Sequence, residues 1–300
     1  MTRFAYACLC ALLATTAALA EDTATGVAAR QIAAEVPATD IWLVELPAAA
    51  EKTGPVNITN RPGYDNQPAF VAAQRILYTS IRPDGQSDIY SYDRQTGETA
   101  RLTRTPESEY SPTPVPDGSG FSVVRVEADG AQWLWAYSAD GAPRSRLLPG
   151  IDNVGYHAWI SADELAVFLV DEPPVLRVAP PEGGAGNDLA SGVGRGLAAA
   201  PQRRALAYTR RDAADRIELW IYDAVDNTSR SFGGAPGATE DLAWMPDGRL
   251  LMSADRRIFI RAPDQEAWRL LADLSTRVPG PISRLAIDPS GRWLAFVVSE

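Results

Sequence analysis

Two neighbouring acidic side chains offer the clearest chemistry in this 300-residue chain. Glu240 and Asp241 stand directly before a short apolar run that begins at Leu242. Carboxylate oxygens are the ligands that calcium prefers, so the pair is a candidate metal site with Ca²⁺ as its candidate ion. Adjacent carboxylates are also typical of a solvated surface, and the sequence leaves both interpretations open. No other cofactor is indicated.

Residues for nucleophilic catalysis or zinc binding are scarce. His157 is the only histidine, and both cysteines, Cys8 and Cys10, fall in the N-terminal apolar run, which argues against a zinc site. A Gly-x-Ser-x-Gly nucleophile elbow does not occur. We therefore predict no catalytic residue and interpret His157 as a structural or channel-lining histidine.

The elements that would position these side chains follow from an internal repeat. Six copies of a strand–turn–strand unit recur at intervals of 40 to 45 residues, most clearly in 112–124, 242–252 and 285–296. Their Pro-Asp-Gly or Pro-Ser-Gly turns suit a tight reversal between strands. Two further strands follow each unit, as in 88–103. This pattern predicts an all-β fold, a six-bladed β-propeller of four-stranded antiparallel blades.

The ends of the chain predict how the propeller closes. The last copy stops at Glu300 after two strands, and the segments 40–46 and 55–60 supply the missing two. We expect the N- and C-terminal strands to share one blade, which removes two open sheet edges. The predicted organisation is a signal peptide (1–20), a lead segment (21–39) and the propeller (40–300).

The third and fourth strands carry a recognisable motif. Asp88-Ile89-Tyr90, then Asp93, Thr96-Gly97 and Leu102-Thr103, together with Trp244 to Gly248, resemble the WD40-like repeat of periplasmic TolB-like propellers. The resemblance spans about residues 40–300 and implies a six-bladed ring that serves as a docking surface. The α/β domain that precedes the TolB propeller has no counterpart in residues 21–39, so the resemblance does not extend to a Tol–Pal role.

Aligning the six copies places one residue of each just before its inner strand, where it faces the mouth of the central channel. The candidate partner-binding residues at or beside these positions are Tyr64, Asn66, Gln67, Tyr110, Ser111, Tyr156, His157, Arg195 and Arg284. Tyr64 and Tyr110 are expected to be exposed interface anchors. Trp159 and Trp244 lie within the repeat and are expected to pack between blades.

The N-terminus predicts export. Arg3, the apolar run 4–13 and Ala18-Leu19-Ala20 form a signal peptide cleaved near Ala20, which predicts a periplasmic or secreted protein. The mature chain has no predicted transmembrane segment, and a net charge of −10 argues against nucleic-acid binding. The leading hypothesis is a non-enzymatic binding or scaffolding module for an envelope protein or peptide. A metal-dependent hydrolase or lyase acting at the channel is the alternative.

One segment departs from the repeat. Residues 171–196 are rich in glycine and proline. We predict a surface loop that replaces the outer strands of the third blade and could serve a specific partner.

Overall fold

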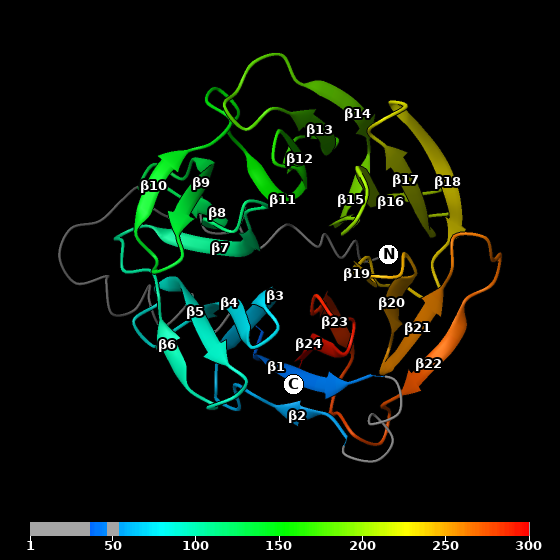
Figure 1. The fold of residues 1–300 in the computed structure, drawn as a ribbon, viewed down its shortest axis with the longest axis horizontal. Helices are drawn as coiled ribbons and strands as arrows, with labels where there is room; N and C mark the ends of the chain where they lie inside the picture. Colours follow the sequence, from blue (N-terminus) through cyan, green and yellow to red (C-terminus); the bar gives the residue numbers. More distant parts are fainter. Residues whose placement is uncertain (1–36, 47–53, 300) are drawn as a thin grey trace, which may run out of the picture.

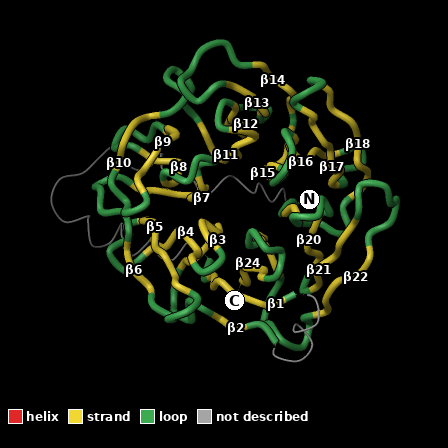
Figure 2. The backbone as a smooth tube through the Cα atoms, viewed as in Figure 1, coloured by secondary structure: helices red, strands yellow, loops and turns green. Residues whose placement is uncertain are grey.

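A computed structural model describes residues 37–46 and 54–299. Within these ranges the chain forms 24 strands and no helix (Figure 1). Strands and loops alternate around a common centre (Figure 2), which confirms the predicted all-β propeller. The predicted signal peptide, its cleavage site and nearly all of the lead segment lie outside the described residues. No helix in the described part of the chain is long and apolar enough to cross a membrane.

Four blades are separate antiparallel sheets whose strands follow one another in chain order. Blade two holds β7 (Ser108–Pro114), β8 (Gly120–Val126), β9 (Gln132–Ser138) and β10 (Pro143–Arg146). Blade three holds β11 (Val154–Ser161), β12 (Glu164–Leu169), β13 (Val175–Ala179) and β14 (Asn187–Ser191). Blade four holds β15 (Val193–Ala199), β16 (Ala205–Arg211), β17 (Ile217–Asp223) and β18 (Thr228–Gly234). Blade five holds β19 (Leu242–Trp244), β20 (Leu250–Ala254), β21 (Arg257–Arg261) and β22 (Arg269–Asp273).

The remaining two blades confirm that the N- and C-terminal strands share one blade. Blade one holds β3 (Tyr64–Ala72), β4 (Arg75–Ile81), β5 (Ser87–Asp93) and β6 (Thr99–Arg101). Blade six combines β23 (Ile282–Ile287) and β24 (Trp293–Ser299) with β1 (Thr39–Glu45) and β2 (Val56–Asn57). β1 pairs with β24 antiparallel along its whole length, from Thr39 opposite Ser299 to Glu45 opposite Trp293. A single parallel bridge between Thr39 and Tyr64 joins blade six to blade one.

The turns form for the reason the sequence suggests. In blade two the backbone N–H of Gly118 donates to the carbonyl of Val115, and Asp117 accepts from the backbone N–H of Ser119 at 2.8 Å. Gly118 has φ +71°, a conformation that glycine adopts without strain. The same turn recurs at Gly248, so these residues set the hairpin between the first and second strands of blades two and five.

Neighbouring blades pack through the inner strands, meaning the first strand of each blade. These contact one another in the order β3, β7, β11, β15, β19, β23 and back to β3. Trp244 of blade five is buried and donates its indole N–H to the carbonyl of Ala198 in blade four at 2.9 Å. Trp159 of blade three reaches Ser122 of blade two in the same way. Both tryptophans therefore contact the preceding blade.

Glycine permits the closest approach between blades four and five. A Cβ on Gly196 in β15 would lie 2.0 Å from the carbonyl oxygen of Glu240, in the connection between β18 and β19. This contact brings Glu240 and Asp241 against β15, so it helps to position the acidic pair at the channel.

The structure corrects the prediction for residues 171–196. Blade three keeps both outer strands, β13 and β14, within this segment. Val175, Leu176 and Val178 supply the apolar side chains of a strand, and the clustered Pro180-Pro181 and Gly183-Gly184 occupy only the turn that follows. The glycines and prolines thus mark a connection and not a missing half-blade.

Candidate functional site

A cavity of about 500 Å³ lies where the six inner strands meet, and residues from all six blades line it. One part of its lining carries the polar residues Gln67, Ser111, Tyr156, Arg195, Asp241 and Arg284. We call this part the mouth. The other part is apolar and includes Phe70, Pro114, Trp159, Trp244 and Ile287, which we call the apolar wall. The alignment of repeats therefore brought together residues that do line one cavity.

Backbone irregularities aim the mouth residues into the channel. Gln67, Ser111 and Arg284 have φ of +57°, +54° and +52°, the left-handed region that non-glycine residues rarely occupy. Each lies where the pairing of the inner strand with its neighbour shifts register. Such bulges redirect side chains, and strained backbone of this kind gathers at functional sites. Equivalent irregularities in blades one, two and six thus mark the mouth independently of the side chains.

Two candidate residues hold adjacent blades together. The Gln67 side-chain oxygen accepts hydrogen bonds from the Ser111 backbone N–H at 2.9 Å and from the Thr79 hydroxyl at 2.8 Å. Asn66 is buried and accepts from the Gln67 backbone N–H. The Gln67 side chain therefore joins blades one and two at the mouth. Asn66 holds the backbone of Gln67 through its hydrogen bond.

The structure corrects the expectation for two tyrosines. Tyr64 and Tyr110 are only 6% and 2% exposed. Tyr110 packs with Val124 and Leu134 in the core between blades two and three. Each tyrosine precedes the bulge of its strand, on the part that the neighbouring blade covers, so neither is an exposed anchor.

Arginines surround the candidate metal ligands. The Glu240 carboxylate accepts from the Arg195 backbone N–H at 2.9 Å and from the Arg211 guanidinium at 3.1 Å. Asp241 accepts from Arg195 at 3.2 Å and forms an ion pair with Arg284 at 3.7 Å. In the described residues, no group of three or more His, Cys, Asp or Glu side chains gathers to hold a metal. Calcium takes six to eight oxygen ligands, so an ion bound here would have to displace the guanidinium groups that now pair with Glu240 and Asp241.

Arg284 spans the channel. Its guanidinium leaves β23 in blade six and donates to the hydroxyl of Tyr156, in β11 of blade three, at 2.9 Å. The same guanidinium lies 4.8 Å from the centre of the Tyr156 ring. Figure 1 places β23 and β11 on opposite sides of the centre. Burial lowers the pKa of Arg284, but Tyr156 and Asp241 raise it by more, so the guanidinium stays charged.

His157 lines the cavity and also contacts the preceding blade. It is buried, and its Nε2 lies 2.7 Å from the Ser122 hydroxyl, which also accepts from the Trp159 indole. Burial lowers the pKa of His157 to about 3, so the imidazole is neutral at physiological pH. Ser122 is fully buried in β8, and its contact with His157 joins blades two and three.

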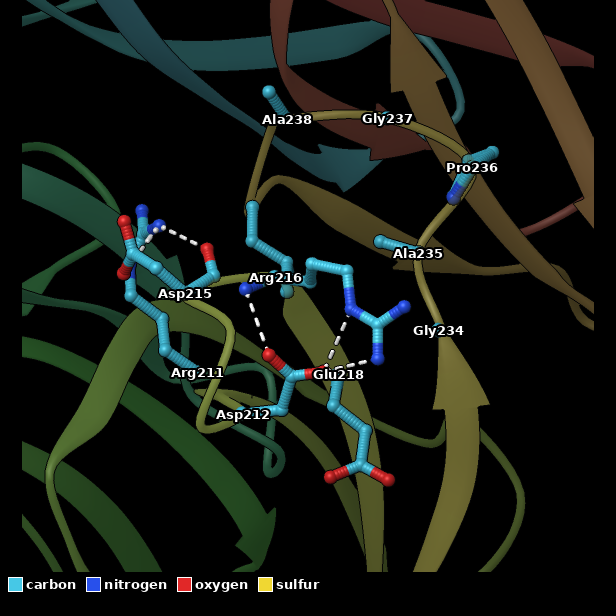
Figure 3. Close-up of a pocket in the computed structure, with 11 residues that line it drawn as sticks. Arg211, Asp212, Asp215, Arg216, Glu218, Gly234, Ala235, Pro236, Gly237 and Ala238 are labelled. Atoms are coloured by element: carbon cyan, nitrogen blue, oxygen red, sulfur yellow. Dashed lines mark hydrogen bonds and ion pairs between the residues drawn. The ribbon is translucent and has the colours of Figure 1, made fainter.

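A second hollow lies beside the mouth. It has a volume of about 580 Å³ between the loop 212–216 and the connection 234–238 (Figure 3). Arg211 pairs there with Asp215 at 3.3 Å, and its other contact is Glu240. Sequence reasoning missed Arg211, which the structure places at the end of β16. The charged residues thus form one continuous network from this hollow to Tyr156.

Comparisons with known proteins support the fold. No protein-family model and no curated protein matches the sequence. A TolB structure from Agrobacterium tumefaciens superposes with a TM-score of 0.67 at 12% identity, over 88% of this chain and 99% of that chain. A gluconolactonase from Xanthomonas campestris gives 0.60 at 16%, over 88% and 97%. TolB from Acinetobacter baumannii gives 0.57 at 15%, over 88% and 64%. The chain therefore has the fold of these propellers, as the sequence resemblance predicted.

Proposed function

We propose that this protein is an exported, non-enzymatic binding module that docks a protein or peptide of the bacterial envelope at the mouth of its channel. The observation that carries the proposal is the network of Arg195, Arg211, Arg284, Glu240 and Asp241 around a cavity that all six blades line. Fixed ion pairs at a concave opening give electrostatic specificity for a partner. The likeness to TolB structures is in keeping with this function but shows the fold alone.

The direct test places a photo-crosslinking amino acid at Ala238. This residue is exposed, lies in the hollow beside the mouth and is labelled in Figure 3. A matched control carries the same amino acid at Ser229, which is exposed on the outermost strand of the same blade. We expect a covalent adduct in the cell envelope from position 238 and none from position 229.

The captured protein is then purified and tested directly. It should bind the wild-type propeller and lose binding to an Arg195→Gln/Arg284→Gln double variant that retains its thermal melt. Adducts of equal yield from both positions, or undiminished binding to the double variant, would contradict docking at the mouth.

A metal-dependent hydrolase or lyase that uses Glu240 and Asp241 is the second candidate, because one similar fold is a gluconolactonase. A thermal melt with calcium and with a chelator tests it. A metal at a hundred times its dissociation constant adds about 2.7 kcal/mol, which raises the midpoint of a domain of this size by roughly 5 °C. A rise of that size, lost in a Glu240→Gln/Asp241→Asn variant, would support the enzyme. No rise would argue against a calcium site.

A further inference from the structure

The cavity carries positive charge inside an acidic protein. Its charged lining residues are Arg195, Arg284 and Asp241, while His157 is neutral because its pKa is lowered to about 3. The lining therefore has a net charge of +1, obtained as two guanidinium groups minus one carboxylate. The whole chain has a net charge of −10. This local reversal of sign favours an anionic group at the mouth.

Arg284 has hydrogen-bonding capacity to spare. A guanidinium offers five N–H donors, and among the described residues Arg284 makes one hydrogen bond, to Tyr156. Its ion pair with Asp241 is 3.7 Å long, and Asp241 is shared with Arg195. The Arg284 side chain is 16% exposed, so few water molecules reach it. Planar donors of this kind suit a carboxylate bound through two hydrogen bonds.

The rest of the cavity suits a peptide. β7, β11, β15, β19 and β23 each pair with another strand on one side only, so their other edge has no strand partner, although side chains engage part of its backbone, such as the N–H groups of Ser111 and Arg195. Such edges bind an extended backbone. Phe70, Trp159 and Trp244 of the apolar wall provide an apolar surface in the same cavity. A volume of about 500 Å³ falls within the ordinary range for ligand sites.

From these observations we infer that the channel binds the C-terminus of a peptide chain. The terminal carboxylate lies on Arg284 and Arg195, the backbone follows an inner-strand edge, and an apolar last side chain contacts the apolar wall. This inference rests on the proposed docking function and names the chemical group that the mouth recognises.

In the protein without ligand, the two arginines of the site contact Asp241 and Tyr156. Without ligand, Asp241 partly neutralises both arginines, and the hydrogen bond from Arg284 to Tyr156 crosses the channel. A ligand carboxylate takes the place of Asp241 on the guanidinium groups. Removal of the Asp241 charge should therefore strengthen ligand binding, an effect opposite to that expected for a metal ligand.

The experiment is isothermal titration of the wild-type propeller with N-acetyl-Ala-Ala-Leu as the free acid. The control ligand is the same peptide with a C-terminal amide. We expect the amide to bind at least about tenfold more weakly, because it lacks a charge-assisted hydrogen bond. Octanoate is the third ligand, since it carries a carboxylate on an apolar chain without peptide groups, and it should bind more weakly than the free acid.

Variants identify the residues responsible. Arg284→Gln and Arg195→Gln should each weaken binding of the free acid about tenfold or more. Arg195 is 38% exposed, so its variant keeps the inference testable if Arg284→Gln fails to fold. Asp241→Asn should strengthen binding. Arg257→Gln is the matched control, because Arg257 is 47% exposed, pairs with Asp273 and lines neither the cavity nor the second hollow.

Several outcomes would overturn the inference. These are equal affinity for acid and amide, no binding of the free acid at concentrations up to about 10 mM, octanoate binding as tightly as the peptide, or unchanged affinity in a folded Arg195→Gln variant. If an adduct forms at position 238 while acid and amide bind equally, docking at the mouth stands and carboxylate recognition fails.

Discussion

Two buried titratable groups should make the stability of this protein unusually insensitive to mild acid. Glu109 is fully buried in β7 and accepts hydrogen bonds from the hydroxyls of Thr103, Thr105 and Tyr137. Burial raises the pKa of Glu109 from 4.5 to about 7, whereas it lowers the pKa of His157 from 6.5 to about 3. The two shifts have opposite effects on stability.

The signs follow from proton uptake. Glu109 stabilises the fold fully below pH 4.5, and this contribution is lost as the pH rises through 7, since only the folded state holds the proton between these values. His157 contributes stability above pH 6.5, which is lost as the pH falls through 3. Each slope is about 1.4 kcal/mol per pH unit, so the two cancel between pH 4.5 and 6.5.

Replacing either Glu109 or His157 should reveal the pH dependence of the unfolding free energy that the other residue causes. In Glu109→Gln the free energy of unfolding should rise relative to wild type by about 3 kcal/mol from pH 4.5 to 6.5, which is two units at about 1.4 kcal/mol each. In His157→Gln it should fall by a similar amount. Urea unfolding followed by tryptophan fluorescence at several pH values measures both differences. Nearby Asp88 is present in all three proteins, so its titration largely cancels.

The reasoning is refuted if the difference in unfolding free energy between Glu109→Gln and wild type stays constant across this pH range. A constant difference would mean that Glu109 is ionised in the folded protein over this range, and a fall in the difference would contradict the reasoning equally.

Three further predictions concern the fold. Trp244→Ala should lower the free energy of unfolding by about 3–5 kcal/mol, as measured in urea, because it removes a buried indole and its hydrogen bond to the preceding blade; a loss below about 1 kcal/mol would mean that the blades repack. Gly196→Ala should lower the melting temperature, since its Cβ would lie 2.0 Å from the Glu240 carbonyl oxygen, while Gly234→Ala, with nothing within 4 Å, should change it little; equal effects would contradict the close approach. Deletion of residues 293–300 should abolish the cooperative thermal transition because it removes the strand between β1 and β23, and a retained transition would show that blade six is dispensable.

The repeat predicted the fold because each turn is encoded locally. Pro, Asp and Gly at fixed positions determine the hairpins, and their spacing determines the number of blades. The same spacing identified Gln67, Ser111 and Arg284 as equivalent, and all three adopt left-handed backbone conformations in their strands.

The contacts of the site could not be predicted in the same way. Arg284 and Tyr156 are 128 residues apart, and Arg211 and Glu240 are 29 apart, so no local pattern links them. The burial of Tyr110 depends on which side of the strand faces the next blade, and a shift of one residue reverses that side. The glycines and prolines of 171–196 hid two short strands for a related reason, since turn residues lowered the strand signal on either side.

The pairing of β1 with β24 has a consequence for biogenesis. The first strand of the propeller meets its main partner only when the last residues have been made, because Thr39 lies opposite Ser299. Contacts of such long sequence separation form slowly. Blades two to five can assemble from consecutive segments, but blade six must wait until β24 has been made. A propeller built this way stays incompletely folded until its strand β24 has been synthesised. The strand order itself thus makes the closing of blade six the last step of folding.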